Sequence, residues 1–270
     1  MTMTSNNRIY SKQSPEKDIT PQKIAKTVSA EVIEPLYIND IASEYQKPSK
    51  EILPKAFFVV IAGGEVRERD YLKYISNSDK FNRIIIDFIA DPNRLSPKGM
   101  LSIAQYKKAF YLTSQEVTIE VPDKIFIISD VDDFMTELLE IRNVCLEEQL
   151  HLIISNSCFE VWLYYAYRAE FPSFPIPSKY ETISWKFKRW LPSIVKGGIN
   201  PGKALLNIKI NIDNAKANYK VDKNGIPELF STNMFELAEE MLPLIEPELS
   251  KIIEENRIRE IAYRNHHKSK

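Results

Sequence analysis

The sequence predicts an α/β fold: a mostly parallel sheet flanked by helices, with a helical C-terminal part. Short apolar runs rich in β-branched residues alternate with segments whose apolar residues recur at helical spacing. Strands separated by helices need right-handed crossovers, which bring the ends of the strands to one edge of the sheet. Gly64 and Glu65, residues 130–133, and Ser155 and Asn156 are then expected to converge at that edge. With 270 residues, 44% of them hydrophobic, the chain is long enough to bury a full core.

Four buried strands are predicted, at residues 56–62, 84–89, 125–130 and 151–155. The first ends at Gly63 and Gly64, and a helix with acidic residues in its first turn follows at 65–75. Ser96 and Pro97 form a cap-plus-proline signal for a helix at 98–113. Further helices are predicted from Phe134 towards His151 and directly after Ser155. The predicted α/β domain covers 51–170.

The rest of the chain has a different character. Residues 1–50 are predicted to form a flexible or partly helical arm. A proline-rich connector at 171–178 opens a helical part that we expect to extend over 171–256 and to pack on the α/β domain. Its helices are predicted at 182–195, 202–219 and 232–253, the last disturbed by two prolines, and a basic tail follows at 257–270.

Cysteine and hydropathy patterns set the expected location. Cys145 and Cys158 lie inside apolar patterns, and their spacing suggests neither a zinc site nor a disulfide framework. The sequence shows no long apolar segment and no signal-peptide pattern. We therefore expect a cytoplasmic protein without a membrane partner.

Charge is distributed unevenly although the formal net charge is only -1. Residues 116–148 carry ten Asp or Glu against two Lys or Arg, whereas residues 179–223 carry ten Lys or Arg against three Asp or Glu. One interpretation is a metal site that faces a polyanion. The other is a pair of solvated helix faces of opposite sign that pack on each other.

The acidic centre contains the candidate metal ligands. Asp130 and Asp132, two residues apart at the end of a strand, point to the same side and can share a divalent cation. Asp133 can join them or cap the next helix, which is the ordinary role of Asp at such a junction. Three carboxylates so close together repel one another unless a cation intervenes, which favours Mg²⁺ or Mn²⁺ binding.

Two glutamates and a group of basic residues complete the candidates. Glu65 stands in a helix's first turn, where a carboxylate needs no further function. Glu160 lies in an apolar helix, so its burial requires a partner: an arginine, a backbone amide or a metal. Basic residues interleave with Trp185, Phe187 and Trp190, which suits nucleic-acid stacking, but the helical spacing of these aromatics favours a core role. These basic candidates are Lys186, Lys188, Arg189, Lys196 and Lys203.

Three motifs in this order resemble the RloB family of bacterial phage-defence proteins. They are Gly64-Glu65-Val-Arg-Glu68-Arg-Asp-Tyr71, Ser129-Asp130-Val-Asp132-Asp133 and Ser155-Asn-Ser-Cys-Phe-Glu160-Val-Trp162-Leu163. The similarity spans about 56–242. It implies a Toprim-like domain, in which a glutamate after the first strand and an Asp-x-Asp motif bind Mg²⁺ (or Mn²⁺) for nucleic-acid cleavage. It also implies a possible ABC- or AAA-type ATPase partner.

One departure from the family's pattern matters. The turn after the first strand usually reads Glu-Gly-Glu, and its first glutamate is the expected general acid or base; here that position is Gly63. Two hypotheses follow. The chain is either a Mg²⁺-dependent nuclease, with Asp130 and Asp132 as catalytic ligands and Glu65 as acid–base group, or a degenerate module that binds nucleic acid or a partner ATPase without cleaving.

Overall fold

The computed structural model describes residues 54–64, 66–91, 95–113, 122–132, 134–176, 183–195 and 198–268. The predicted N-terminal arm and three candidate site residues, Glu65, Asp133 and Lys196, lie outside these ranges. The described residues all belong to one compact unit.

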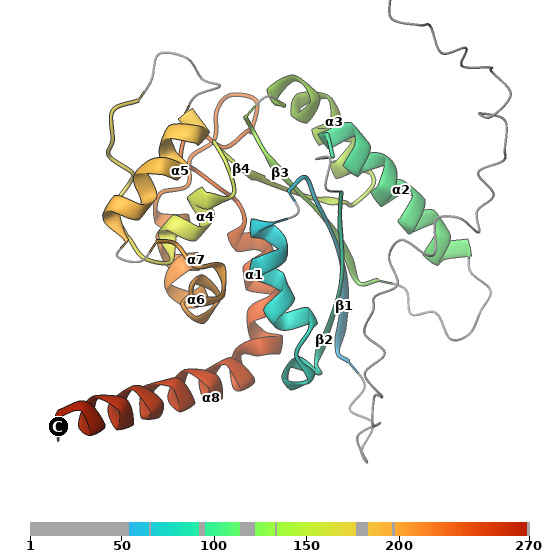
Figure 1. Cartoon of the computed structure of the whole chain (residues 1–270). Coiled ribbons are helices and arrows are strands. Elements are labelled where there is room, and N and C mark those ends of the chain that lie inside the picture. Colours follow the sequence, from blue (N-terminus) through green and yellow to red (C-terminus); the bar gives the residue numbers. More distant parts are fainter. Residues whose placement is uncertain are drawn as a thin grey trace, which may run out of the picture. The chain divides into compact units, whose positions relative to one another are not determined.

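A four-stranded parallel sheet forms the centre of this unit (Figure 1). Its strands are β1 (Ala56–Ala62), β2 (Ile84–Ala90), β3 (Lys124–Asp130) and β4 (His151–Ser155), in the order β2-β1-β3-β4. The connections carry α1 (Arg67–Ser76) with the 3-10 turn η4 (Asp79–Phe81), α2 (Pro97–Thr113) and α3 (Met135–Glu147). The predicted α/β architecture with a parallel sheet is confirmed.

Both faces of the sheet are covered, as the continuous apolar strands require. Figure 1 shows α2 and α3 on one face and the other helices on the opposite face. Val59 and Ile61 of β1 pack towards α2 and α3, whereas Phe58, Val60 and Ala62 join the larger core on the other side. Successive strand side chains point to opposite faces, so the sheet buries every apolar residue in the middle of β1.

The C-terminal helices contribute most of the larger core. They are α4 (Glu160–Tyr165), α5 (Ile183–Ile194), α6 (Pro201–Leu206), α7 (Ile208–Ala217) and α8 (Phe235–Lys268). The prediction of one helix over 202–219 is wrong, because the helix is interrupted at Asn207, between α6 and α7. The Asn207 amide donates to the carbonyl of Ala166 at 3.1 Å, a tertiary contact that stabilises the break.

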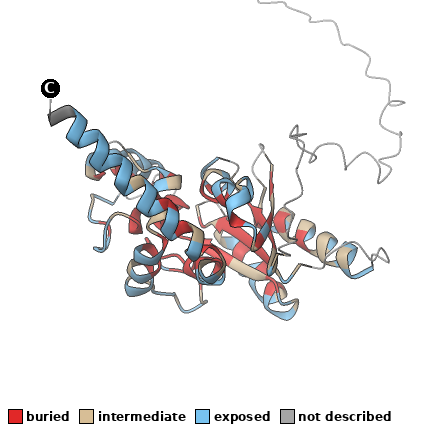
Figure 2. Cartoon of the chain, turned by 90° about the horizontal axis from the view of Figure 1, so that it is seen from below, coloured by how far each residue is buried: buried red, intermediate tan, exposed pale blue. Residues whose placement is uncertain are grey.

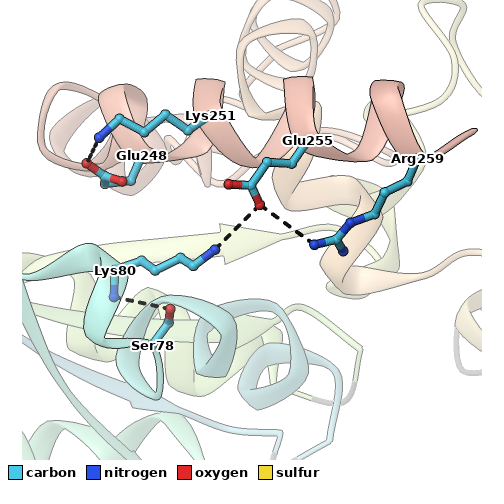
Figure 3. Close-up of polar contacts among 6 residues, drawn as sticks. All are labelled: Ser78, Lys80, Glu248, Lys251, Glu255 and Arg259. Atoms are coloured by element: carbon cyan, nitrogen blue, oxygen red, sulfur yellow. Dashed lines mark hydrogen bonds and ion pairs between the residues drawn. The ribbon is translucent and has the colours of Figure 1, made fainter. Parts of the chain in front are cut away.

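Helix α8 is longer than the predicted 232–253 and runs to Lys268. The chain stays helical through Pro243 and Pro247, and Figure 1 shows the helix changing direction along its length, as proline within a helix causes. Its last turns are exposed (Figure 2). Lys80 of η4 lies 3.7 Å from the Glu255 carboxylate and links this part of α8 to the body (Figure 3).

None of the helices in the described ranges combines the length and the apolar character that crossing a bilayer requires.

Candidate active site

A pocket of about 280 Å³ opens where β1, β2 and β3 end and where α1 and α4 begin. Its lining is strongly acidic. Five carboxylates line it, from residues spread over the chain: Glu68, Asp91, Asp130, Asp132 and Glu160. The basic residues of the lining are Arg67 and Lys188. The parallel topology thus gathers carboxylates at the edge where open α/β sheets hold their ligands.

Asp130, the last residue of β3, is partly buried as a whole, less so than Glu68 and Glu160. Its Oδ1 atom is buried and has no hydrogen-bond partner among the described residues. Burial raises the pKa of Asp130 well above its usual range, and the negative charges of Glu68 and Glu160 raise it further. An enclosed carboxylate among like charges is costly when ionised, so this position favours a cation or a proton.

Asp132 is held by the neighbouring polypeptide. Its backbone N–H donates to the carbonyl of Ser157 at 3.4 Å, and the Ser184 hydroxyl of α5 donates a short hydrogen bond to its Oδ1 atom. Asp130 and Asp132 therefore line the same pocket, as their spacing predicted, but a hydroxyl from the C-terminal part already engages Asp132.

Glu160, in the first turn of α4, is 8% exposed. Its Oε2 atom lies 3.4 Å from Nζ of Lys188, and its Oε1 atom lies 3.9 Å from Nε of Arg67. The partner that burial required is thus a pair of basic side chains. Burial alone would lower the pKa of Lys188, but the surrounding acidic groups, Cys158 and Glu160 foremost, raise it overall.

Glu68 is a pocket residue that was not among the predicted site residues. It is 6% exposed and lies on the same buried face of α1 as Tyr71, Leu72 and Ile75. A β-carbon at Gly64 would lie 2.5 Å from both oxygens of the Glu68 carboxylate, so glycine there leaves the room that this carboxylate occupies. The signal in the sequence was a carboxylate within an i, i+3, i+4, i+7 apolar pattern.

Asp91 is the second pocket carboxylate that was not predicted. It directly follows β2, the strand next to β1, and so reaches the same edge of the sheet. A single acidic residue after a strand is not a motif in the sequence. Whether Asp91 lies near Asp130 depends on the order of the strands in the sheet. That order, with β1 between β2 and β3, is decided by the fold.

A metal ion suits the chemistry of these donors, because Mg²⁺ and Mn²⁺ prefer carboxylate oxygens and water. The enclosed Oδ1 atom of Asp130 and the convergence of Glu68 and Glu160 on it fit this requirement. Within the described ranges, no three His, Cys, Asp or Glu side chains are arranged to hold a metal as they stand.

The predicted nucleic-acid residues fall into two groups. Lys186, Lys188, Arg189 and Lys203 are all exposed, but of these four Lys188 lines the pocket and the others lie outside it. The Arg189 guanidinium stacks 4.5 Å from the ring centre of Trp185. Trp185 is 56% exposed, so the prediction of a core role is wrong for this tryptophan, although it holds for the buried Phe187.

Ser155 and Asn156 were expected to converge on the strand-end site, but their side chains bind elsewhere. The Ser155 hydroxyl hydrogen-bonds to that of Thr232 at 2.8 Å, and the Asn156 amide donates to the carbonyl of Pro227 at 2.8 Å. These contacts anchor the segment before α8 to the end of β4. The end of β4 does converge with the site as predicted, since Ser155 pairs with Asp130, but tertiary hydrogen bonds draw the side chains of Ser155 and Asn156 to the C-terminal part.

Comparisons with known proteins bear on the family. No curated protein and no solved structure matches the chain. The family model described as RloB-like protein matches residues 58–241, which include most of β1, the acidic pocket and the first turns of α8. The chain thus belongs to the RloB-like protein family.

Proposed function

We propose that this chain is a Mg²⁺- or Mn²⁺-dependent nuclease that cleaves phosphodiester bonds, with a Toprim-like catalytic domain. The observation that carries the proposal is the enclosed, unpartnered Oδ1 atom of Asp130 in a pocket lined by five carboxylates. A divalent cation bound there would stabilise the charge that develops on a phosphodiester during hydrolysis. Asp130, Asp132 and Glu160 are the described residues that would hold it.

Glu68 is our candidate for the acid–base role that Gly63 cannot perform. A side chain at position 63 would start 3.3 Å from the carbonyl oxygen of Leu95, a tight contact. Glu68 instead reaches the pocket from α1, beside the glycine turn. Carboxylates commonly serve as general acids or bases, and Glu68 is a carboxylate of the pocket lining that is only 6% exposed. Glu65, the acid–base candidate predicted from the sequence, stays a prediction because it lies outside the described residues.

The nucleic acid would approach across α5. Lys186 and Arg189 are exposed on this helix, and the stacked pair of Arg189 and Trp185 offers both a cation for phosphate and a flat ring for a base. The helix also reaches the pocket through Ser184 and Lys188. A strand bound along α5 would therefore lead its backbone towards the carboxylates.

The decisive experiment is hydrolysis of labelled plasmid, single-stranded DNA and RNA by the purified protein with Mg²⁺ or Mn²⁺. Asp130→Asn and Asp132→Asn should abolish metal-dependent cleavage. Glu68→Gln should lower its rate by about 10² to 10⁴, the usual contribution of a general acid or base. Glu65→Gln, run in parallel, distinguishes the two glutamates. The residue that transfers the proton is the one whose substitution lowers the cleavage rate more.

A second candidate function is a degenerate module that binds nucleic acid or a partner ATPase of the ABC or AAA type without cleaving. Gly63, which replaces the expected carboxylate, favours it. Metal binding and nucleic-acid binding without cleavage of any substrate, with or without a co-expressed ATPase, would support this alternative. In both cases we propose that the protein acts in the cytoplasm in defence against phages.

A further inference from the structure

Helix α5 reaches into the acidic pocket with two polar side chains one turn apart. The Ser184 hydroxyl donates to Asp132, and the Lys188 ammonium pairs with Glu160 at 3.4 Å. Residues four apart lie on the same face of a helix, so both groups approach the pocket together. The C-terminal helical part thus supplies a hydrogen-bond donor and a cation to the carboxylates of the α/β part.

Lys188 is the closer of the two cations. Arg67, the other basic residue of the lining, lies 3.9 Å from Glu160 and its side chain is 49% exposed. Lys188 acts electrostatically on Asp130 and Asp132 as well as on Glu160. Its charge also opposes the rise in the pKa of Asp130 that burial and the other carboxylates cause. Lys188, whose side chain is itself 43% exposed, is thus the nearer of the two basic residues that face the Glu160 carboxylate.

We propose that Lys188 is the built-in counter-cation of this pocket: it neutralises Glu160 and Asp130 while no divalent cation is bound, and a divalent cation must displace it to bind. This inference rests on the proposed function, because it assumes that the pocket takes a metal. It also gives a reason why the described carboxylates are not arranged as a ready metal site, since Lys188 and Ser184 each engage one of them.

The exchange has two consequences of opposite sign. Without metal, the loss of Lys188 leaves the carboxylates with less compensation, so the folded protein should be less stable. With metal, the same loss removes a competing cation, so the affinity for the metal should rise. A lysine that only held α5 in place would produce the first effect without the second.

The test compares the full-length wild-type protein with Lys188→Met and Lys188→Arg, and Lys186→Met serves as the control on the exposed side of α5. Mn²⁺ binding is measured by calorimetry, and thermal unfolding is measured in chelator and in saturating Mn²⁺. Lys188→Met should bind Mn²⁺ about tenfold more tightly than the wild type, because a competing positive charge is gone. Its melting temperature should fall below that of the wild type in chelator and return to it in Mn²⁺.

Lys188→Arg keeps the charge and should behave as the wild type, as should Lys186→Met. Unchanged or weaker Mn²⁺ binding by Lys188→Met, with binding by the wild type intact, would overturn the counter-cation role and leave the proposed nuclease standing. Tighter binding by Lys188→Arg as well would overturn it too, since the charge would then not be the cause. If neither the wild type nor any variant bound Mn²⁺, the proposed metal-dependent function itself would fail.

Discussion

Nζ of Lys188 lies 3.4 Å from Oε2 of Glu160, so an ammonium group from α5 meets a carboxylate from the first turn of α4 inside an acidic pocket. Lys188 belongs to the basic segment 179–223, whereas Glu160 lies outside the acidic segment 116–148. The two segments themselves meet where Ser184 donates to Asp132, so both contribute to the lining or the contacts of one pocket.

The enclosed carboxylate of Asp130 should cost stability when no cation is bound. Its folded-state pKa is raised by burial and by Glu68, so the penalty is absent below the unfolded-state pKa and grows as the pH rises towards the folded-state value. At neutral pH in chelator, Asp130→Asn should therefore raise the free energy of unfolding by about 1–3 kcal/mol. Urea unfolding measures this, with Asp213→Asn on an exposed face of α7 as the control. A less stable Asp130→Asn would contradict the enclosed-charge argument.

Gly64→Ala should separate the geometry of the pocket from the stability of the fold. The added β-carbon would lie 2.5 Å from both carboxylate oxygens of Glu68, so the end of this side chain must move out of its place. The cost in unfolding free energy should be under about 1 kcal/mol because a glutamate can rotate away. The affinity for the metal and any cleavage rate should fall by a larger factor than this small loss of stability would cause. Gly99→Ala, whose added carbon meets its nearest neighbour at 3.7 Å, is the matched control and should change neither.

Asn233 should stabilise β4, the strand at one edge of the sheet. Its Oδ1 atom accepts from the N–H of Ile154 at 2.6 Å, and its Nδ2 atom donates to the carbonyl of Leu152 at 3.0 Å, so the side chain binds β4 as a further strand would. Asn233→Ala leaves both backbone groups without these bonds and should lower the free energy of unfolding by roughly 1–3 kcal/mol. Chemical denaturation measures the loss. An effect as small as that of Asn224→Ala, on an exposed turn, would show that water replaces the amide.

His151 should make stability depend on pH. Burial lowers the pKa of this half-buried histidine, as does the nearby Lys124, while Glu240 opposes them. Because the folded-state pKa lies below the usual value of 6.5, the unfolded chain takes up the proton first as the pH falls. The contribution of the neutral His151 to the free energy of unfolding is thus fully present above pH 6.5 and is lost as the pH falls towards the folded-state pKa.

His151→Gln should flatten the slope of unfolding free energy against pH between about pH 7 and pH 5, where histidine ordinarily titrates. Denaturation curves of both proteins at matched pH values give the two slopes. Equal slopes would mean that the ring, which lies 4.9 Å from that of Phe126, titrates in the folded protein as it does in the unfolded chain.

The strands and the acidic strand end could be predicted because their signals are local. A run such as residues 56–62 is apolar on both faces, which only a sheet covered on both sides accommodates. Asp130 and Asp132 could be predicted in the same way, because they stand at the end of the apolar run of β3. The interruption between α6 and α7 at Asn207 could not be predicted in this way, because the hydrogen bond that stabilises it goes to a carbonyl 41 residues away in the sequence.

The chain alone determined the parallel α/β layout, the two aspartates at the end of β3, and the need of the buried Glu160 for a partner. The tertiary structure decided that Lys188 is this partner. It also decided that Glu68 and Asp91 line the same pocket as the two aspartates. The physical reason lies in the range of the interactions. Apolar periodicity is set by neighbours in sequence, whereas the balance of buried charges depends on which distant side chains the fold brings within a few ångströms.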